Sequence, residues 1–324
     1  MRYLTLPTTD LHVSVLCLGL ANIGVKNTEG EAMALLDAFL DAGGNFLDTA
    51  RVYSDWVPGE SNRSERILGT WMASRKVRNR VVVATKGGHP DLVDKIPRLS
   101  PEAMATDLKG SLEKLQTDVI DLYYLHRDDP ARTVSHLLDV LHDFQQAGHI
   151  RHYACSNWSP ERMRQAREYA QEKGYTGFVA NQMRWSVAGF LGKPPGDTTM
   201  CAMDGETMDF HRRTGLAAIP YNSQSGGFFS KLHADPKSVE KSGYFTKGNL
   251  GVYTYLKGVS EDLGRPLSQI ALAYFWDQPF VSIPIVGCRN LEQLGDSLGA
   301  ATCDLPPDVV RKISDLTSVS RGGI

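Results

Sequence analysis

Short apolar segments alternate with amphipathic segments along the whole chain, and this alternation restricts the fold more than any other feature. We expect apolar strands at 13–20, 45–50, 80–86, 120–126, 150–156, 178–185, 216–223 and 281–286. Continuous apolar strands separated by helices are typical of a parallel sheet covered by helices. Eight such cycles in 324 residues favour a closed (β/α)8 TIM barrel. A doubly wound dinucleotide-binding sheet is disfavoured, because no GxGxxG motif follows the first strand.

The segments between the strands carry helix start and stop signals. We expect helices at 29–41, 64–75, 100–116, 133–147, 159–174, 206–214, 253–263, 268–276, 291–298 and 308–316. Ser-Pro-Glu at 100–102 and at 159–161 combines a capping serine, a first-turn proline and an acid, and Ser64 is a plausible cap. Residues 2–12 are expected to form an N-terminal β-hairpin, and 308–316 an extra C-terminal helix. We therefore expect one barrel domain over residues 1–324.

Composition excludes several function classes. The formal net charge is −2, which gives no general attraction to nucleic acid or to a membrane surface. We expect no membrane span, because no apolar run is long enough for one, and no secretory signal at the N-terminus. The five cysteines (Cys17, Cys155, Cys201, Cys288 and Cys303) have no metal-ligand spacing. We expect a cytoplasmic enzyme with reduced thiols, no metal, and a monomeric or homo-oligomeric state.

Polar residues stand where three consecutive strands end. Asp48 ends the strand over 45–50, Lys86 the strand over 80–86 and His126 the strand over 120–126, and Tyr53 lies on the loop after Asp48. Each has an ordinary structural interpretation by itself, such as a cap or a solvated charge. TIM barrels, however, hold their active sites at the carboxyl ends of the strands. Because these strands are neighbours, we expect the four side chains to converge at one mouth.

These four groups suit proton transfer to an oxygen. A free tyrosine has a pKa of about 10, and a nearby ammonium such as Lys86 lowers it. A buried lysine needs a counter-charge, which Asp48 supplies. His126 can hydrogen-bond a substrate oxygen. The set indicates carbonyl reduction, provided that a hydride donor is present.

Later strand ends indicate a nicotinamide dinucleotide as that donor. Ser156, Asn157 and Gln182 have polar groups for a planar amide, and Tyr221 can stack on its ring. Barrels often bind phosphate after strands seven and eight. The first of these loops contains Ser223, Gln224 and Gly226, and the second contains Gly287, Arg289 and Gln293.

At these residues the chain resembles the aldo-keto reductase family. The segments that carry the resemblance are Asp48-Thr-Ala-Arg-Val-Tyr53, Ala84-Thr-Lys86, Asp121-Leu-Tyr-Tyr-Leu-His126, Ser156-Asn157-Trp, Asn181-Gln182, Tyr221-Asn-Ser and Ile283-Pro-Ile-Val-Gly-Cys-Arg-Asn-Leu-Glu-Gln. The resemblance implies a barrel that reduces carbonyls with NAD(P)H. It implies Tyr53 as general acid, Asp48 and Lys86 as the pair that tunes it, and His126 as the group that orients the carbonyl. It also implies nicotinamide contacts from Ser156, Asn157, Gln182 and Tyr221.

The chain departs from the family after the eighth strand. Many NADP-preferring members carry two basic residues there, whereas the corresponding positions look like Gly287 and Gln293, and only Arg289 is basic. This loop resembles that of bacterial members and of the channel-associated branch. We expect NADP, with NAD as the alternative.

The substrate is expected to be a small carbonyl or alcohol: an aldehyde, a ketone or a sugar-like compound. Its pocket would be shaped by loops 54–63, 87–99 and 186–206 rather than by a C-terminal lid. Two other functions stay open. One is a redox-sensing, cofactor-binding subunit with little turnover, and the other is a Schiff-base lyase that uses Lys86.

Overall fold

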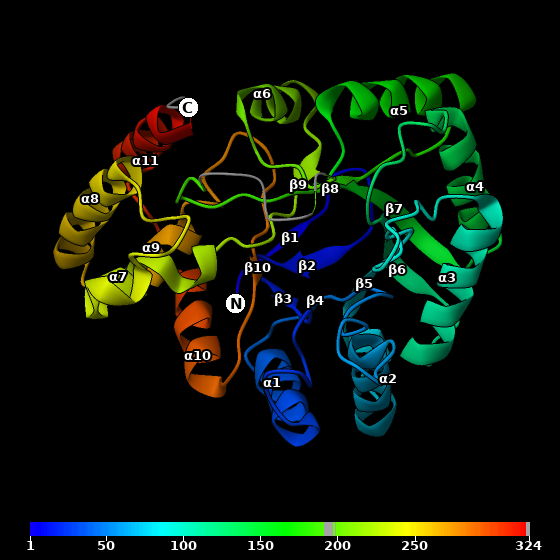
Figure 1. Cartoon of the computed structure of the whole chain (residues 1–324), viewed down its shortest axis with the longest axis horizontal. Coiled ribbons are helices and arrows are strands. Elements are labelled where there is room, and N and C mark those ends of the chain that lie inside the picture. Colours follow the sequence, from blue (N-terminus) through cyan, green and yellow to red (C-terminus); the bar gives the residue numbers. More distant parts are fainter. Residues whose placement is uncertain (191–196, 198, 322–324) are drawn as a thin grey trace.

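A parallel sheet of eight strands forms the centre of the protein, and helices surround it (Figure 1). The structure, a computed structural model, describes residues 1–190, 197 and 199–321. In chain order the strands are β3 (Cys17–Gly19), β4 (Phe46–Asp48), β5 (Val82–Gly87), β6 (Ile120–Leu125), β7 (Ile150–Ser156), β8 (Ala180–Gln182), β9 (Ala217–Ala218) and β10 (Ile285–Val286). Each strand from β3 to β9 pairs with the next, and β10 pairs with β3. The expected fold class is confirmed.

The sheet closes into a barrel through the residues that precede β10. Ala218 of β9 forms a parallel bridge with Ser282. Its backbone N–H donates to Val281 O at 2.9 Å, and its carbonyl accepts from Ile283 N at 2.9 Å. Closure pairs the two outer strands of the eight-stranded sheet along this seam and brings the carboxyl ends of all eight strands to one mouth.

Helices follow the strands and form the outer layer. They are α1 (Glu29–Asp41), α2 (Arg63–Arg75), α3 (Pro101–Leu115), α4 (Val134–Gln146), α5 (Pro160–Lys173), α6 (Gly205–Thr214), α7 (Phe228–Ala234), α8 (Lys247–Leu263), α9 (Leu267–Ala273), α10 (Leu291–Gly299) and α11 (Pro307–Arg321), with 3-10 turns η1 (Arg78–Arg80), η2 (Ser225–Gly227), η3 (Pro236–Val239) and η4 (Ala300–Thr302). Ser100 and Ser159 cap α3 and α5 as expected, each accepting a backbone N–H. In Figure 1, α7, α8, α9 and α11 gather on the left of the barrel.

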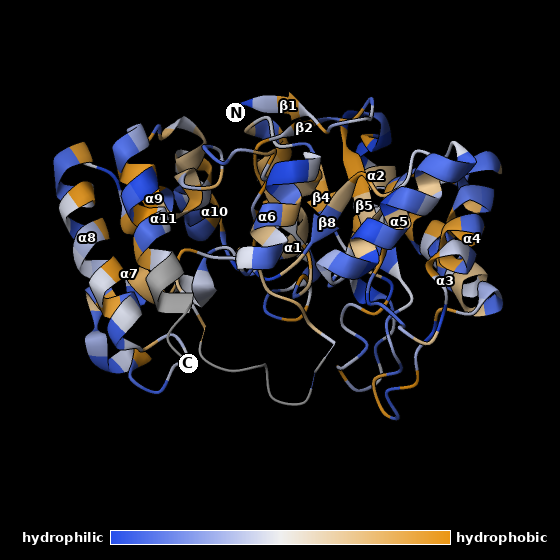
Figure 2. Cartoon of the chain, turned by 90° about the horizontal axis from the view of Figure 1, so that it is seen from above, coloured by the Kyte–Doolittle hydropathy of each residue, from blue (hydrophilic) through white to orange (hydrophobic). Residues whose placement is uncertain are grey.

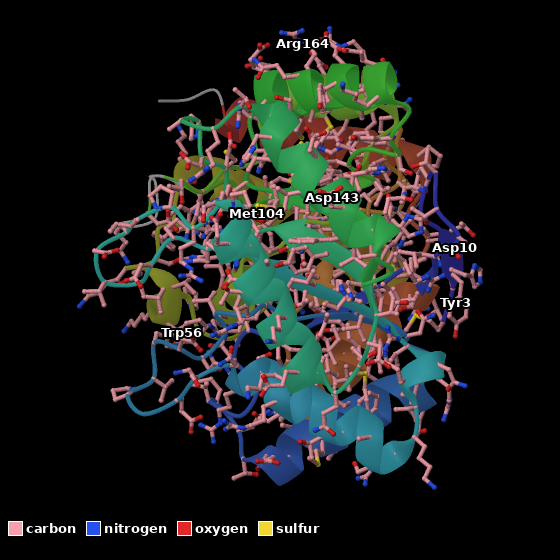
Figure 3. The ribbon with its side chains drawn as sticks, turned by 90° about the vertical axis from the view of Figure 1, so that its right-hand side faces the viewer. Tyr3, Asp10, Trp56, Met104, Asp143 and Arg164 are labelled. Carbon is pink, nitrogen blue, oxygen red and sulfur yellow. The ribbon has the colours of Figure 1, made fainter. Side chains whose placement is uncertain are left out.

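A β-hairpin covers the end of the barrel opposite the mouth. Strands β1 (Tyr3–Thr5) and β2 (His12–Ser14) pair antiparallel. Leu6, Leu11 and Val13 belong to the same buried cluster as side chains inside the barrel. The hairpin lies at the upper edge in Figure 2, and the long loops hang at the lower edge. Figure 3 shows the same separation, with Tyr3 and Asp10 on one side and Trp56 on the other. The mouth is therefore the open end.

Side chains alternate between the barrel interior and the helix layer. Along β4, Phe46 belongs to the interior cluster and Leu47 to the outer one. Leu122 and Tyr124 of β6 are likewise interior, whereas Tyr123 and Leu125 are exterior. A strand repeats every two residues, so the next interior positions along β4 and β6 fall at the carboxyl ends of these strands. The candidate site is built on those positions.

Three expectations about local structure were wrong. The apolar run 13–20 is not one strand, because its first residues pair in the hairpin and the barrel strand begins at Cys17. Ser64 lies inside α2 rather than capping it, since its hydroxyl donates to Leu20 O and contacts Thr49 Oγ1. The loop expected after the seventh strand, with Ser223, Gln224 and Gly226, contains η2 and leads directly into α7.

Among the residues that the structure describes, no helix is both long and apolar enough to cross a membrane. All five cysteines are among these residues, and no disulfide joins them.

Candidate active site

Three of the four expected proton-transfer residues occupy interior positions at neighbouring strand ends. Asp48 ends β4, Lys86 stands near the end of β5, and His126 follows β6. In the register of the sheet, Asp48 lies opposite Ala84 and Lys86 lies opposite Tyr124. All three side chains are buried. Tyr53 reaches the same mouth from the loop after β4, so the four residues do converge.

Lys86 is the centre of this group. Its ammonium donates to Asp48 Oδ1 at 2.6 Å, to the Thr49 carbonyl at 2.7 Å and to the Tyr53 hydroxyl at 3.0 Å. An ammonium has three N–H donors, so each has an acceptor. The other carboxylate oxygen of Asp48 accepts from Gln182 Nε2 at 2.9 Å. The buried charges are thus paired and hydrogen-bonded, as burial requires.

The Tyr53 hydroxyl is left with a proton to give. Because its oxygen accepts the hydrogen bond from Lys86, its own O–H is directed to another acceptor. Burial raises the pKa of Tyr53 above its usual value, and the Lys86 ammonium offsets only part of that rise. The net direction is opposite to the lowering expected from the sequence, which did not weigh desolvation. The phenol is therefore protonated at neutral pH.

Lys86 keeps its proton as well. Burial lowers the pKa of Lys86, but the charges of Asp48 and Tyr53 and their hydrogen bonds raise it more, so that it ends above the usual value. An ammonium that is protonated and has used all its donors is a hydrogen-bond donor and a fixed charge. It is a poor nucleophile, because its nitrogen lone pair is occupied by the proton.

His126 lies beside the phenol. The ring centroids of Tyr53 and His126 are 5.8 Å apart, and those of His126 and His89 are 4.7 Å apart. Burial, followed by the charge of Arg127, holds the pKa of His126 well below its usual value. His126 is therefore neutral and has one N–H to donate. Its Nδ1 is buried without a hydrogen bond to any residue in the described ranges.

Arg127 ties the loop after β8 to this histidine. Its guanidinium donates to the His126 carbonyl at 2.8 Å, to Thr199 Oγ1 at 3.0 Å and to Asp197 Oδ2 at 3.0 Å. The expectation that 186–206 shapes the pocket lies partly outside the described residues. Of the described residues in this segment, Asp197 and Thr199 accept hydrogen bonds from Arg127, which joins them to the mouth.

The residues expected to hold a planar amide also lie together. Asn157 donates to Ser156 Oγ at 2.9 Å, and its Oδ1 accepts from the Tyr221 hydroxyl at 2.8 Å. Asn157 has φ 61°, a left-handed conformation that asparagine tolerates well. The Gln182 amide donates a hydrogen bond to Asp48. Ser156, Asn157 and Gln182 are buried, and the amide groups of Asn157 and Gln182 bond within the protein.

A cleft of about 610 Å³ extends from Tyr53 and Asp48 towards α10. The sequence-predicted cofactor residues in its lining are Tyr221, Ser223, Gln224, Gly226, Gly287, Arg289 and Gln293. Ser156, Asn157 and Gln182 are not in that lining. Asn22 and Lys231, which were not among the individually predicted cofactor residues, also line the cleft. The apolar spacing of Phe228, Phe229 and Leu232 is a helix signal that would have revealed the element that carries Lys231.

The residues of the cleft fit a phosphate-bearing dinucleotide. A Cβ added at Gly226 or Gly287 would meet no protein atom within 4 Å, so the bare backbone faces open space there. Gln224 Oε1 accepts from Gly287 N at 3.3 Å and thereby joins the two loops. Arg289 and Lys231 bring cations to the same cleft. Backbone amides and cations are the groups that bind phosphate.

Comparison with known proteins agrees with this geometry. A sequence model of the Aldo/keto reductase family matches residues 15–318. Over 326 residues the chain is 28% identical to the Uncharacterized oxidoreductase YrpG of Bacillus subtilis, with 98% of this chain and 96% of that protein covered. It is 29% identical to the Aryl-alcohol dehydrogenase [NADP(+)] of Phanerodontia chrysosporium, with 98% and 86% covered. It is 30% identical to the Norsolorinic acid reductase B of Aspergillus parasiticus, with 95% and 82% covered. A barrel with this mouth, matched by the family model over nearly its whole length, belongs to the aldo/keto reductase family and is an NAD(P)-dependent oxidoreductase.

Proposed function

We propose that the protein interconverts a small carbonyl compound and its alcohol, with Tyr53 as the general acid and base. One observation carries this proposal: the Lys86 ammonium has used its three donors on Asp48, Thr49 and Tyr53. The phenol oxygen is thereby fixed as an acceptor from Lys86, and its proton is available to a substrate oxygen. Phenol and imidazole then approach the same oxygen from two sides.

Each residue has a distinct task in the reduction. His126, held neutral by its buried position, donates a hydrogen bond that orients the carbonyl oxygen. Tyr53 transfers its proton to that oxygen as negative charge develops there. Lys86 stabilises the phenolate that remains, and Asp48 balances the charge of Lys86. In the oxidation direction the phenolate takes the proton back from the alcohol.

NADP(H) is the cofactor that we propose, and when bound it supplies the hydride for the carbonyl carbon. Tyr221 lines the same cleft as Tyr53 and would contact the nicotinamide, with Ser156, Asn157 and Gln182 near its amide. Ser223, Gln224, Gly226, Gly287 and Gln293 would hold the phosphates. Arg289 and Lys231 support the preference for NADP, since both are cations in the same cleft. A relative is named for NADP(+) as well.

The lyase alternative is disfavoured by the state of Lys86. A Schiff base requires a neutral amine, whereas Asp48 and Tyr53 keep the pKa of Lys86 above its usual value. The redox-sensing alternative shares the cleft and differs in turnover alone. It predicts tight cofactor binding with almost no multiple turnover over a broad range of carbonyls.

A two-step experiment tests the proposal. Fluorescence titration with NADPH and with NADH measures cofactor affinity, and a panel of aromatic, aliphatic and sugar aldehydes and ketones is then followed at the absorbance of the reduced nicotinamide. We expect tighter binding of NADPH and many turnovers with at least one aldehyde. Tight binding with less than one turnover per site across the panel would support the sensing subunit instead.

A further inference from the structure

Arg184 is a half-buried cation at the mouth, on the extension of β8. Its backbone N–H donates to Cys201 O at 3.0 Å, and its carbonyl accepts from Met203 N at 2.8 Å. On the other side it forms a parallel bridge with Tyr221, whose ring lines the cleft. The chain at Arg184 is therefore held as a short strand between the loop after β8 and the loop after β9.

The strand period determines which way this arginine faces. Gln182 points into the barrel, because its amide contacts Asp48 at 2.9 Å. Met183 and Trp185 face outward, since both belong to the apolar cluster around α7, α8 and α9. By this period the Arg184 side chain leaves the strand on the side of Gln182, and its guanidinium lies over Phe190, which packs at the edge of the same apolar cluster. Arg184 lies one strand repeat, about 7 Å, further out along the direction that leads from Asp48 to solvent.

The Arg184 guanidinium has no anionic partner among the described residues. It lies 4.3 Å from the ring centre of Phe190, and its Nε is buried without a hydrogen bond to any of them. Residues 191–196 and 198, which are not described, contain no Asp or Glu. Two other cations at the strand ends are paired, Lys86 with Asp48 and Arg127 with Asp197. An unpaired buried donor is costly unless a ligand satisfies it.

We infer that Arg184 binds a negatively charged group of the substrate, a carboxylate in the first instance, while the carbonyl is held at Tyr53 and His126. This inference rests on the proposed function and extends it to the substrate class. A planar guanidinium offers two parallel N–H groups that match a carboxylate. Its stacking on Phe190 orients that plane in advance, which reduces the entropy lost on binding.

The charge balance of the mouth supports an anionic ligand. Lys86 is paired with Asp48 and Arg127 with Asp197, His126 is neutral, and Arg184 forms no ion pair with any described residue. The field of Arg184 reaches the Tyr221 hydroxyl: burial raises the pKa of Tyr221, and Arg127 and Arg184 both act against that rise. A substrate anion beside Tyr221 would therefore meet an excess of positive charge.

Two aldehydes of the same shape test the inference. 4-Carboxybenzaldehyde carries a carboxylate, and 4-carbamoylbenzaldehyde carries its neutral isostere. We expect the native protein to prefer the carboxylate in kcat/KM, chiefly through KM. In Arg184→Gln and Arg184→Met this preference should fall about 10- to 100-fold, the size of a charge-assisted hydrogen bond. Arg184→Lys, which keeps the charge but not the planar fork, should restore part of it.

The matched control is Arg212→Gln on α6, where an exposed arginine pairs with Asp209. This variant should keep the native preference. An unchanged preference in both Arg184→Gln and Arg184→Met would overturn the inference and leave Arg184 a structural partner of Phe190. A common fall in kcat/KM for both aldehydes, without a change in their ratio, would overturn it equally.

A binding measurement separates this inference from the proposed function. Calorimetric titration of the full chain with benzoate and with benzamide requires no turnover. We expect benzoate to bind the native protein more tightly, and the difference to disappear in Arg184→Met. If no carbonyl of the wider panel is turned over, the proposed function fails, and the titration still decides the anion subsite. Equal binding of the two compounds by the native protein would contradict the subsite alone.

Discussion

The Lys86 ammonium lies 3.0 Å from the Tyr53 hydroxyl oxygen, and this contact uses the last of its three donors. The two residues come from different elements, β5 and the loop after β4. Their contact joins a permanently charged buried group to a partly exposed phenol at the cleft wall. A cation fixed on one side of the oxygen leaves the proton on the other side, where a substrate can reach it.

Replacing Tyr53 by phenylalanine removes the transferable proton and keeps the ring. We expect kcat to fall by about 10²- to 10⁴-fold, the range for general acid–base catalysis, with NADPH affinity nearly unchanged. Steady-state kinetics and fluorescence titration measure the two. Tyr169→Phe is the control, because that hydroxyl bonds to Asp139 on the helix layer. Near-native turnover in Tyr53→Phe would remove the catalytic assignment.

Substitutions of Asp48 and Lys86 should have coupled effects on the free energy of unfolding. Asp48→Asn leaves a buried ammonium without a counter-charge, and we expect it to lower the free energy of unfolding by about 3–5 kcal/mol. Lys86→Met should lower the free energy of unfolding by a similar amount, because it leaves the carboxylate buried without a counter-charge. The double variant removes both charges and should recover much of the loss. Urea unfolding of the four proteins measures the coupling, and strict additivity would contradict the buried pair.

Glu65 should make stability depend on pH. Its side chain is fully buried, accepts from Thr85 Oγ1 at 2.5 Å, and burial raises its pKa from 4.5 to about 7. The unfolded chain releases this proton near pH 4.5, whereas the folded chain keeps it until about pH 7. Stability is therefore lost as pH rises through that window, by about 3 kcal/mol in total.

Glu65→Gln removes the titrating group from this site. Thermal unfolding between pH 5 and pH 8 should show a flatter profile for the variant, with its largest gain over the native protein near pH 8. Glu113→Gln on the exposed face of α3 is the control and should keep the native slope. A native slope in Glu65→Gln would show that other groups cause the pH dependence.

Gly287 tests the phosphate-binding part of the cleft. A Cβ at this position would meet no protein atom within 4 Å, so Gly287→Val should leave the unfolding free energy nearly unchanged. The added methyl groups would occupy the space that we assign to the dinucleotide. We expect NADPH to bind at least about 10-fold more weakly, a loss of about 1.4 kcal/mol. Gly258→Val on α8, another open position, should bind NADPH normally.

Arg289 tests the cofactor preference. Arg289→Gln removes a cation at the cleft, and we expect NADPH affinity to fall about 10-fold, because a charge-assisted bond to phosphate is lost. NADH affinity should change by less than about 2-fold. Fluorescence titration of both cofactors gives the ratio. An equal loss for both would assign Arg289 to a phosphate that the two cofactors share.

The sequence alone determined which segments of the chain form strands and helices. Period-two and apolar patterns identified the strands that carry Asp48, Lys86 and His126, and α1 and β7 have the expected bounds. Ser100 and Ser159 predicted two helix starts. These signals are local, because a cap or a glycine stop acts within one turn of its own residue. Convergence of the four proton-transfer residues followed from one rule of topology, the common mouth of parallel strands.

Long-range contacts were decided only by the tertiary structure. Burial of Tyr53 outweighs the charge of Lys86 and sets the direction of its pKa, and no pattern in the sequence reports the local dielectric. Gln182 supports Asp48 from 134 residues away. Arg127 forms an ion pair with Asp197. Arg184, which is two positions after Gln182, forms no ion pair with a carboxylate in the described chain. A side chain's charge can be read from the sequence, but its partners and its exposure to water depend on how the whole barrel packs.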